Sequence, residues 1–309
     1  MQRSTRHFNV KALYVVLAAL FWGISGGIGG VLLADGWDPF VVSLSRGAIG
    51  LGCVLIWLAL RPGESGLGSR RLWLWSVVAG LGVAGNFSFY FVSIAEGSVA
   101  IAATLMYSAP VFVYLLSFVF GLEEPTLWKA LAIAVVMAGI VLLTQIYDIG
   151  ADGLTLVGVG AGLLAGLSYT VFIFGFSYAA PHGSPQAILT IAFTVLALTL
   201  AVPSDTGQIF DVLSTQQWPL FVALGVLGAG LSFALYIIGL TGTKPAVASV
   251  VAMIEPVTAA LFGVLILSET LNGVQVVGMG LILVTVTALS MQSRVEKTRS
   301  DAAKVPPSG

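Results

Sequence analysis

The sequence consists of two apolar halves that repeat one another at an offset of 146 residues. The aligned residues include types that are uncommon in apolar segments: Pro39 and Pro185, Phe87 and Phe233, Tyr90 and Tyr236, Pro110 and Pro256, and Glu123 and Glu269. Near the start of each half, an offset of 143 aligns Gly23 with Gly166 and Ser25 with Ser168. Matches of Leu and Ala are expected by chance, but Pro, Tyr and Glu at one offset indicate a duplication. Duplicated membrane halves are typical of secondary transporters.

The composition excludes a soluble protein. Of the 309 residues 58% are hydrophobic and 9% are charged, and the mean hydropathy is +1.01, whereas a soluble domain has about 25% charged residues. Apolar stretches of about 20 residues, each long enough to cross a hydrocarbon core of about 30 Å, follow one another along the chain. We therefore predict an all-α integral membrane protein.

The apolar stretches predict ten transmembrane helices as two five-helix repeats, 11–145 and 154–291. The predicted spans are 11–33, 39–60, 72–95, 98–120, 126–145, 154–178, 185–202, 218–240, 244–266 and 272–291. The first stretch is too long for a signal-peptide core and is read as retained. Residues 1–10 form an N-terminal segment, and the polar residues 292–309 are predicted to be a disordered tail.

Basic residues fix the predicted orientation. If the N-terminus is cytoplasmic, twelve of the thirteen Lys and Arg lie on the inner side, none lies on the outer side, and Arg46 lies within a span, in accord with the positive-inside rule. We therefore predict a protein of the inner membrane with both termini on the cytoplasmic side. Because five spans per half is an odd number, the second half enters the membrane from the opposite side. The two repeats are therefore predicted to be inverted, so that one half can open outward while the other closes inward.

The pattern resembles a known family. The sequence has two five-span halves, Trp22-Gly23 in the first span, Arg46 in the second, and paired segments that end in Pro110…Glu123 and Pro256…Glu269. In these features residues 11–291 resemble the EamA-type branch of the drug/metabolite transporter (DMT) superfamily, and within it the YddG-like amino-acid exporters. The resemblance implies a ten-helix exporter of small metabolites, often amino acids, with a central cavity between the halves. Two positions break strict two-fold symmetry, because Ala192 aligns with Arg46 and Glu255 aligns with Ala109.

Arg46 and Glu255 are the charged side chains predicted deep within the membrane, where a charge must face protein or a water-filled cavity. Arg46, roughly 10 Å below the outer surface at 1.5 Å per residue, either holds a substrate carboxylate through its two-pronged guanidinium or bonds the carbonyls of broken helices. Glu255, near mid-membrane, either exchanges protons or binds a substrate ammonium. Alternatively it is a neutral acid that caps the backbone groups freed by Pro256. This local role slightly favours a uniporter over a proton antiporter.

Prolines and tyrosines at equivalent positions of the two halves are candidate hinges and gates. Pro110 and Pro256 each remove a backbone N–H near mid-membrane, which makes them either hinges that line the substrate site or static kinks. Tyr90 and Tyr236 are predicted to form a matched pair of gates, outer and inner. The alternative is that both are interfacial anchors, since tyrosine is common at span ends.

A further set of polar and aromatic side chains falls on helix faces that would line a cavity. The set comprises Trp22, Ser25, Asn86, Tyr107, Ser168, Tyr169 and Ser232. Helix–helix hydrogen bonding is the alternative role of its hydroxyl and amide groups. The glycine pairs 23/27, 26/30, 158/162 and 162/166 have the small-xxx-small spacing that allows close helix packing.

The residues that could carry chemistry favour transport over catalysis. Cys53 lies alone in an apolar stretch, and His7 and His182 lie outside the spans, so no metal or other cofactor is predicted. An integral-membrane enzyme would need a cluster of reactive groups at one depth, and a channel would need a ring of filter residues. One Arg against one Glu suits a neutral or zwitterionic small molecule, and phosphates would need more cations. We therefore predict export of neutral or aromatic amino acids, with a lipophilic drug or other neutral metabolite as the alternative. The partners are substrate and lipid bilayer, with no nucleic acid.

Overall fold

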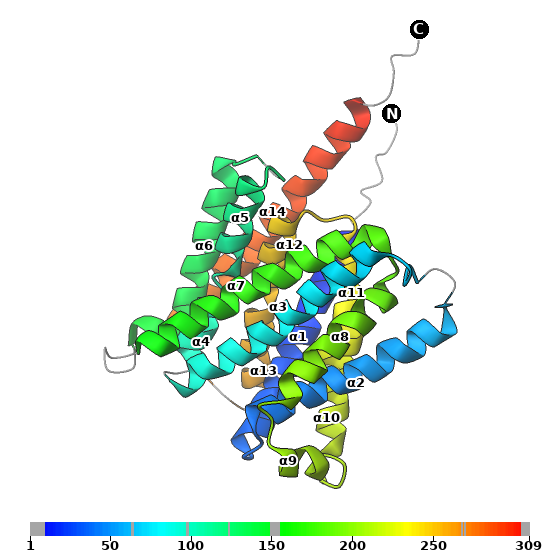
Figure 1. Cartoon of the computed structure of the whole chain (residues 1–309). Helices are drawn as coiled ribbons and strands as arrows, with labels where there is room; N and C mark the ends of the chain where they lie inside the picture. The colour runs from blue at the N-terminus through cyan, green and yellow to red at the C-terminus, as the bar shows by residue number, and fades with distance from the viewer. Residues whose placement is uncertain are drawn as a thin grey trace.

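The computed structural model describes residues 10–303 except 63–64, 97–98, 123, 149–154, 267 and 269. Glu123 and Glu269, which helped to define the repeat, lie outside the described residues. The described part contains helices and no strand (Figure 1). The helices are α1 (Val10–Ala34), α2 (Pro39–Leu60), α3 (Arg70–Ala95), α4 (Val99–Met106), α5 (Ala109–Val119), α6 (Leu127–Thr144), α7 (Leu156–Ala179), α8 (Pro185–Ala201), α9 (Thr206–Asp211), α10 (Trp218–Gly225), α11 (Ser232–Leu240), α12 (Pro245–Ala252), α13 (Ile254–Ile266) and α14 (Gly273–Ala303).

Within the described residues, eight helical stretches are long and apolar enough to cross a membrane, which makes the chain a multi-pass membrane protein. Two further predicted spans correspond to shorter apolar helices, Pro185–Ala201 and Gly273–Ala288. The count of ten spans therefore stays a prediction for these two. α14 continues past the predicted end of its span, so the predicted disordered tail is helical as far as Ala303.

Two predicted spans are interrupted at equivalent positions by proline. α4 ends at Met106 and α12 ends at Ala252, four residues before Pro110 and Pro256. Proline has no N–H to bond the carbonyl four residues earlier, so the last residue of each first segment is the one that loses its helical partner. The chain turns at 107–108 and at Met253 and then resumes as α5 and α13.

A third span changes its helical pitch without a proline. Between α10 and α11 the residues Val226–Leu231 form a π-helical segment. A π turn widens the helix and often marks a functional site. The three irregular spans are thus the fourth, the eighth and the ninth of the predicted ten.

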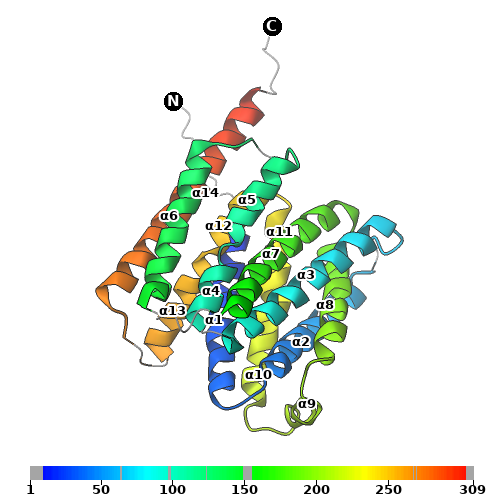
Figure 2. The same cartoon turned by 60° about the vertical axis from the view of Figure 1, so that its left-hand side comes forward.

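The helices pack in pairs that join the two halves of the sequence. α3 packs along α7 and α8, α2 packs against α8, α6 packs against α14, and α1 packs against α11 and α13. Figures 1 and 2 show α6 and α14 side by side at one edge and α2 and α8 side by side at the other. Because partners come from opposite halves, neither half encloses a core of its own.

Side-chain caps fix where several helices begin. Asp38 accepts hydrogen bonds from the backbone N–H groups of Phe40 and Val41, and Thr155 accepts one from Gly158. Each cap satisfies donors that the first helical turn leaves without partners. A loop contact also joins the halves: the Ser184 N–H of the α7–α8 loop donates a 3.2 Å hydrogen bond to the Ser65 carbonyl oxygen of the α2–α3 loop.

The orientation of this assembly can be tested by labelling. We expect a cysteine replacing Gly68, in the α2–α3 loop, to resist an impermeant thiol reagent in intact cells, whereas one replacing Thr206, at the start of α9, reacts. Both positions are exposed, and the background is Cys53→Ser. If the Gly68→Cys protein is labelled as fast as the Thr206→Cys protein, the result contradicts the predicted cytoplasmic termini.

Candidate functional site

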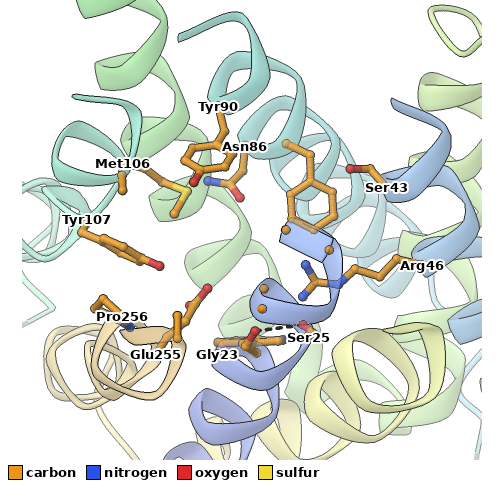
Figure 3. Close-up of a pocket in the computed structure, with 18 of the residues that line it drawn as sticks. Gly23, Ser25, Ser43, Arg46, Asn86, Tyr90, Met106, Tyr107, Glu255 and Pro256 are labelled. Carbon is orange, nitrogen blue, oxygen red and sulfur yellow. Dashed lines mark hydrogen bonds between the residues drawn. The ribbon is translucent and has the colours of Figure 1, made fainter. Parts of the chain in front are cut away.

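A cavity of about 540 Å³ lies among the helices of both halves. Its wall includes side chains from α1, α2, α3, α6, α7 and α13 and from the turn that follows α4 (Figure 3). Of the residues predicted for the site, the following line it: Trp22, Ser25, Arg46, Asn86, Tyr90, Tyr107, Tyr169, Glu255 and Pro256. Its size falls within the range of about 300–1,000 Å³ that is usual for small-molecule sites.

The cavity occupies one end of the helices and not the other. It reaches Leu33 at the end of α1, Val42 near the start of α2, Ile94 near the end of α3 and Thr144 at the end of α6. In the predicted orientation all of these lie in the outer half of the membrane. At the opposite end, side chains such as Tyr236 and Ile237 are fully buried. The cavity therefore has a closed floor on the predicted inner side.

Arg46 is held by the π-helical segment. Its Nε and Nη2 atoms donate hydrogen bonds of 3.0 and 2.7 Å to the Gly228 carbonyl oxygen, and its guanidinium carbon lies 5.0 Å from the centre of the Phe87 ring. The bond to a carbonyl of an irregular helix is the structural role that the sequence left open. The residue also lines the cavity, so this role and a role in substrate binding are compatible.

Glu255 lies in the first turn of α13, directly after the break at Met253. Figure 3 shows its side chain and the Tyr107 hydroxyl directed toward one another in the cavity. α1 fixes its backbone position: a Cβ at Gly23 would lie 2.6 Å from the Glu255 carbonyl oxygen and 2.5 Å from Cβ of Thr258. Only glycine allows this approach, so α1 and the start of α13 are in backbone contact.

The other polar residues of the wall divide into partnered and unpartnered groups. Asn86 donates to the Ala165 carbonyl at 3.0 Å, and Ser25 donates to the Trp22 carbonyl at 2.9 Å. The indole nitrogen of Trp22 and the hydroxyl of Tyr169 are buried and have no hydrogen-bond partner in the part of the chain that the structure describes. A buried polar group without a partner is costly, and in a native site it often marks the place of a bound molecule.

Four predicted site residues do not line the cavity. Ser168 lies against Gly85 of α3, and Ser232, Pro110 and Tyr236 are buried in the packed part of the structure. The two serines precede the lining residues Tyr169 and Phe233. Successive residues of a helix point about 100° apart, and in both pairs the second residue is the one that lines the cavity. Tyr236 instead packs against Trp22, with ring centres 4.9 Å apart.

Several lining residues escaped the sequence analysis. They include Gly30, Phe87, Phe91, Met106 and Phe262. Helical spacing could have identified some of them, because Phe87 is three residues before Tyr90 and Phe262 is seven residues after Glu255, on the same helix faces. Their apolar character gave no separate signal in so apolar a chain.

Comparison with known proteins identifies the relatives of the chain. The model of the EamA-like transporter family matches twice, at residues 9–145 and 156–291. The chain is 24% identical to the transporter YwfM of Bacillus subtilis (strain 168), over 95% of this chain and 98% of that protein. It is 27% identical to the threonine/homoserine exporter RhtA of Escherichia coli (strain K12), over 96% and 97%. A solved crystal structure shares the fold with a TM-score of 0.76 and 20% identity, over 92% of this chain and 97% of that one.

The bond between Arg46 and Gly228 yields a stability prediction. Arg46→Met removes both donors and leaves the carbonyl unpaired, so we expect the purified protein in detergent to unfold at a lower temperature. A hydrogen bond from a charged group contributes about 1.5–3 kcal/mol. Arg46→Lys, which keeps the charge without the two-pronged geometry, should fall between the methionine variant and the unchanged protein. An unfolding temperature that Arg46→Met leaves unchanged contradicts the structural role.

Proposed function

Because the chain belongs to the EamA-like transporter family, we propose that it is a secondary transporter that exports neutral amino acids, aromatic ones included, across the inner membrane. The cavity carries this proposal. It places one cation, Arg46, and one carboxylate, Glu255, in an otherwise mainly apolar wall. A zwitterion with an apolar side chain matches that distribution of charge. The relative RhtA is a threonine/homoserine exporter, which supports the same class of substrate.

Alternating access is proposed from the internal symmetry. When the first five predicted spans are exchanged with the second five, the packing of α3 on α7 maps onto that of α11 on α1, while α2–α8 and α6–α14 map onto themselves. The breaks before Pro110 and Pro256 also exchange. The double match of the family model supports the duplication. An odd number of spans per repeat then makes the repeats inverted, as the mechanism requires.

The one-sided cavity corresponds to an outward-facing state in this scheme. Tyr90 is half-buried and lines the cavity, whereas its counterpart Tyr236 is completely buried against Trp22. The two tyrosines thus have the unequal environments expected of an open outer gate and a closed inner gate. Export requires the reverse state, in which Tyr236 is uncovered and Tyr90 is buried.

One feature favours a second candidate. The side chains of Phe87, Phe91, Met106 and Phe262 give the cavity a largely apolar surface. A lipophilic drug or another neutral metabolite would also bind such a surface. The two candidates differ in their need for Arg46 and Glu255, which only a zwitterion would engage together.

Transport by the purified protein tests the substrate class. In liposomes preloaded with unlabelled phenylalanine, leucine or threonine, we expect counterflow of the corresponding labelled amino acid. Tyr107→Phe removes the hydroxyl that faces Glu255 and should weaken the flux, because polar substrate groups lose a positioned partner. Empty liposomes and the unrelated lipophilic cations used as drug-export probes serve as controls. Transport of the cations with no counterflow of any amino acid supports the second candidate instead.

We further propose that Glu255 couples export to proton entry. The carboxyl group faces Tyr107 and the cavity rather than serving only the backbone near Pro256, so it is placed to exchange a proton with the solvent and to contact a substrate ammonium. This position favours the antiporter over the uniporter that the sequence slightly favoured.

An imposed pH gradient tests the coupling. We expect a gradient that drives protons opposite to the substrate to accelerate transport by the unchanged protein. Glu255→Gln keeps the shape of the side chain but cannot ionise, so it should abolish the acceleration and leave counterflow measurable. Wild-type transport that ignores the gradient identifies a uniporter.

A further inference from the structure

One face of α1 is bare where it borders the cavity. A Cβ added at Gly26 or at Gly30 would meet no atom within 4 Å, and both glycines line the cavity and are exposed. The sequence predicted close helix packing for this pair, and that prediction is wrong. The neighbouring pair Gly23 and Gly27 does pack closely, because a Cβ at Gly27 would lie 2.1 Å from the Phe262 ring.

The second half of the chain carries large side chains at the equivalent positions. At the offset of 143 that aligns Gly23 with Gly166, Gly26 corresponds to Tyr169, Gly29 to Phe172 and Gly30 to Ile173. All three side chains of α7 are buried, with exposed fractions of 4%, 3% and 0%. The positions of α7 that correspond to the bare face of α1 thus carry large, buried side chains.

Phe172 shows how a ring sits at such a position. Its ring centre lies 6.2 Å from that of Phe233 and 6.3 Å from that of Tyr236, distances typical of aromatic clusters. The counterparts of these two partners are Phe87 and Tyr90, which line the cavity. The first half therefore keeps counterparts of the ring's partners, whereas the counterpart of Phe172 itself is Gly29, which also lines the cavity beside Gly26 and Gly30.

We propose that a ring of the substrate occupies this gap, between the Gly26–Gly30 face of α1 and the Phe87 and Tyr90 side chains of α3. Gly26 and Gly30 then determine which side chains the transporter accepts, because any larger residue there would fill the space of the ring. The ligand class is a planar aromatic or similarly broad apolar group joined to a polar group.

An independent observation indicates where the polar group lies. Trp22 is one helical turn before Gly26 on the same face of α1. Its side chain is 3% exposed, and its indole nitrogen has no hydrogen-bond partner among the described residues. The hydroxyl of Tyr169, a residue that also lines the cavity and is 4% exposed, likewise has none there. We place the polar group of a ligand whose ring lies over Gly26 at the end of the cavity that Trp22 and Tyr169 line.

The inference deepens the proposed export of amino acids, and thermal stabilisation in detergent separates the two. Ligands that bind the folded state raise the unfolding temperature by an amount that grows with the logarithm of their concentration relative to Kd. The probes are indole, which has a ring and no amino-acid group, L-alanine, which has the reverse, and L-phenylalanine, which has both. The variants are Gly26→Leu and the milder Gly26→Ala. The matched control is Gly160→Leu in α7, where an added Cβ also meets no atom within 4 Å and which does not line the cavity.

We expect indole and phenylalanine to stabilise the unchanged protein. Gly26→Leu should raise their apparent Kd at least about tenfold, as a changed contact in an apolar pocket does, while Gly160→Leu leaves it unchanged. Gly26→Ala should produce a smaller change in the same direction. The response to alanine should not depend on residue 26.

Other results distinguish failure of the ring subsite from failure of the amino-acid assignment. Equal responses of Gly26→Leu and the unchanged protein overturn the ring subsite, as does an equal loss in Gly160→Leu. Stabilisation by alanine but not by indole overturns the ring subsite and supports amino-acid binding. Stabilisation by indole that Gly26→Leu removes, with no response to alanine or phenylalanine, supports the subsite and contradicts the amino-acid assignment.

Discussion

Within a membrane, a helix that breaks must find new partners for its backbone groups, since lipid offers none. This constraint connects the irregular parts of the structure. The π-helical segment gives its Gly228 carbonyl to Arg46, and the break before Pro256 places Glu255 at the start of α13. Both charged side chains line the same cavity. Irregular backbone and intramembrane charge therefore occur together, and together they position the site.

The same constraint explains why the cavity lies between the two halves. The regular helix α2 packs along α8, and α6 packs along α14. The backbone N–H and C=O groups of these regular stretches are paired within each helix. The helices that are broken or widened belong to the predicted fourth, eighth and ninth spans. Each of these spans contributes to the cavity wall, through Met106, Leu224 and Glu255 respectively. Glycine decides how closely these helices approach. Gly23 brings α1 into backbone contact with α13, whereas Gly26 on the next turn leaves space.

The sequence predicted much of the fold because hydrophobic stretches of span length and basic loops are direct consequences of the bilayer. It also placed Arg46 and Glu255 at the site, because an intramembrane charge has few other locations. It could not assign Ser168 and Ser232 correctly, since a one-residue difference rotates a side chain by about 100° and the sequence does not fix the rotation of a helix that is apolar all round. For the same reason it took Gly26 and Gly30 for a packing face. Which end of the assembly is open depends on conformation and leaves no trace in the sequence.

The central claim is that two inverted halves expose one cavity alternately on the two sides of the membrane. Distances between pairs of spin labels, measured on the protein in liposomes, test it most directly. The outer pair is placed at Gly36 and Glu96 and the inner pair at Pro181 and Thr241, and all four positions are exposed. The account predicts that added substrate produces a population in which the outer distance shortens while the inner distance lengthens. Distances that change in the same direction, or an inner distance that never changes while transport proceeds, contradict it.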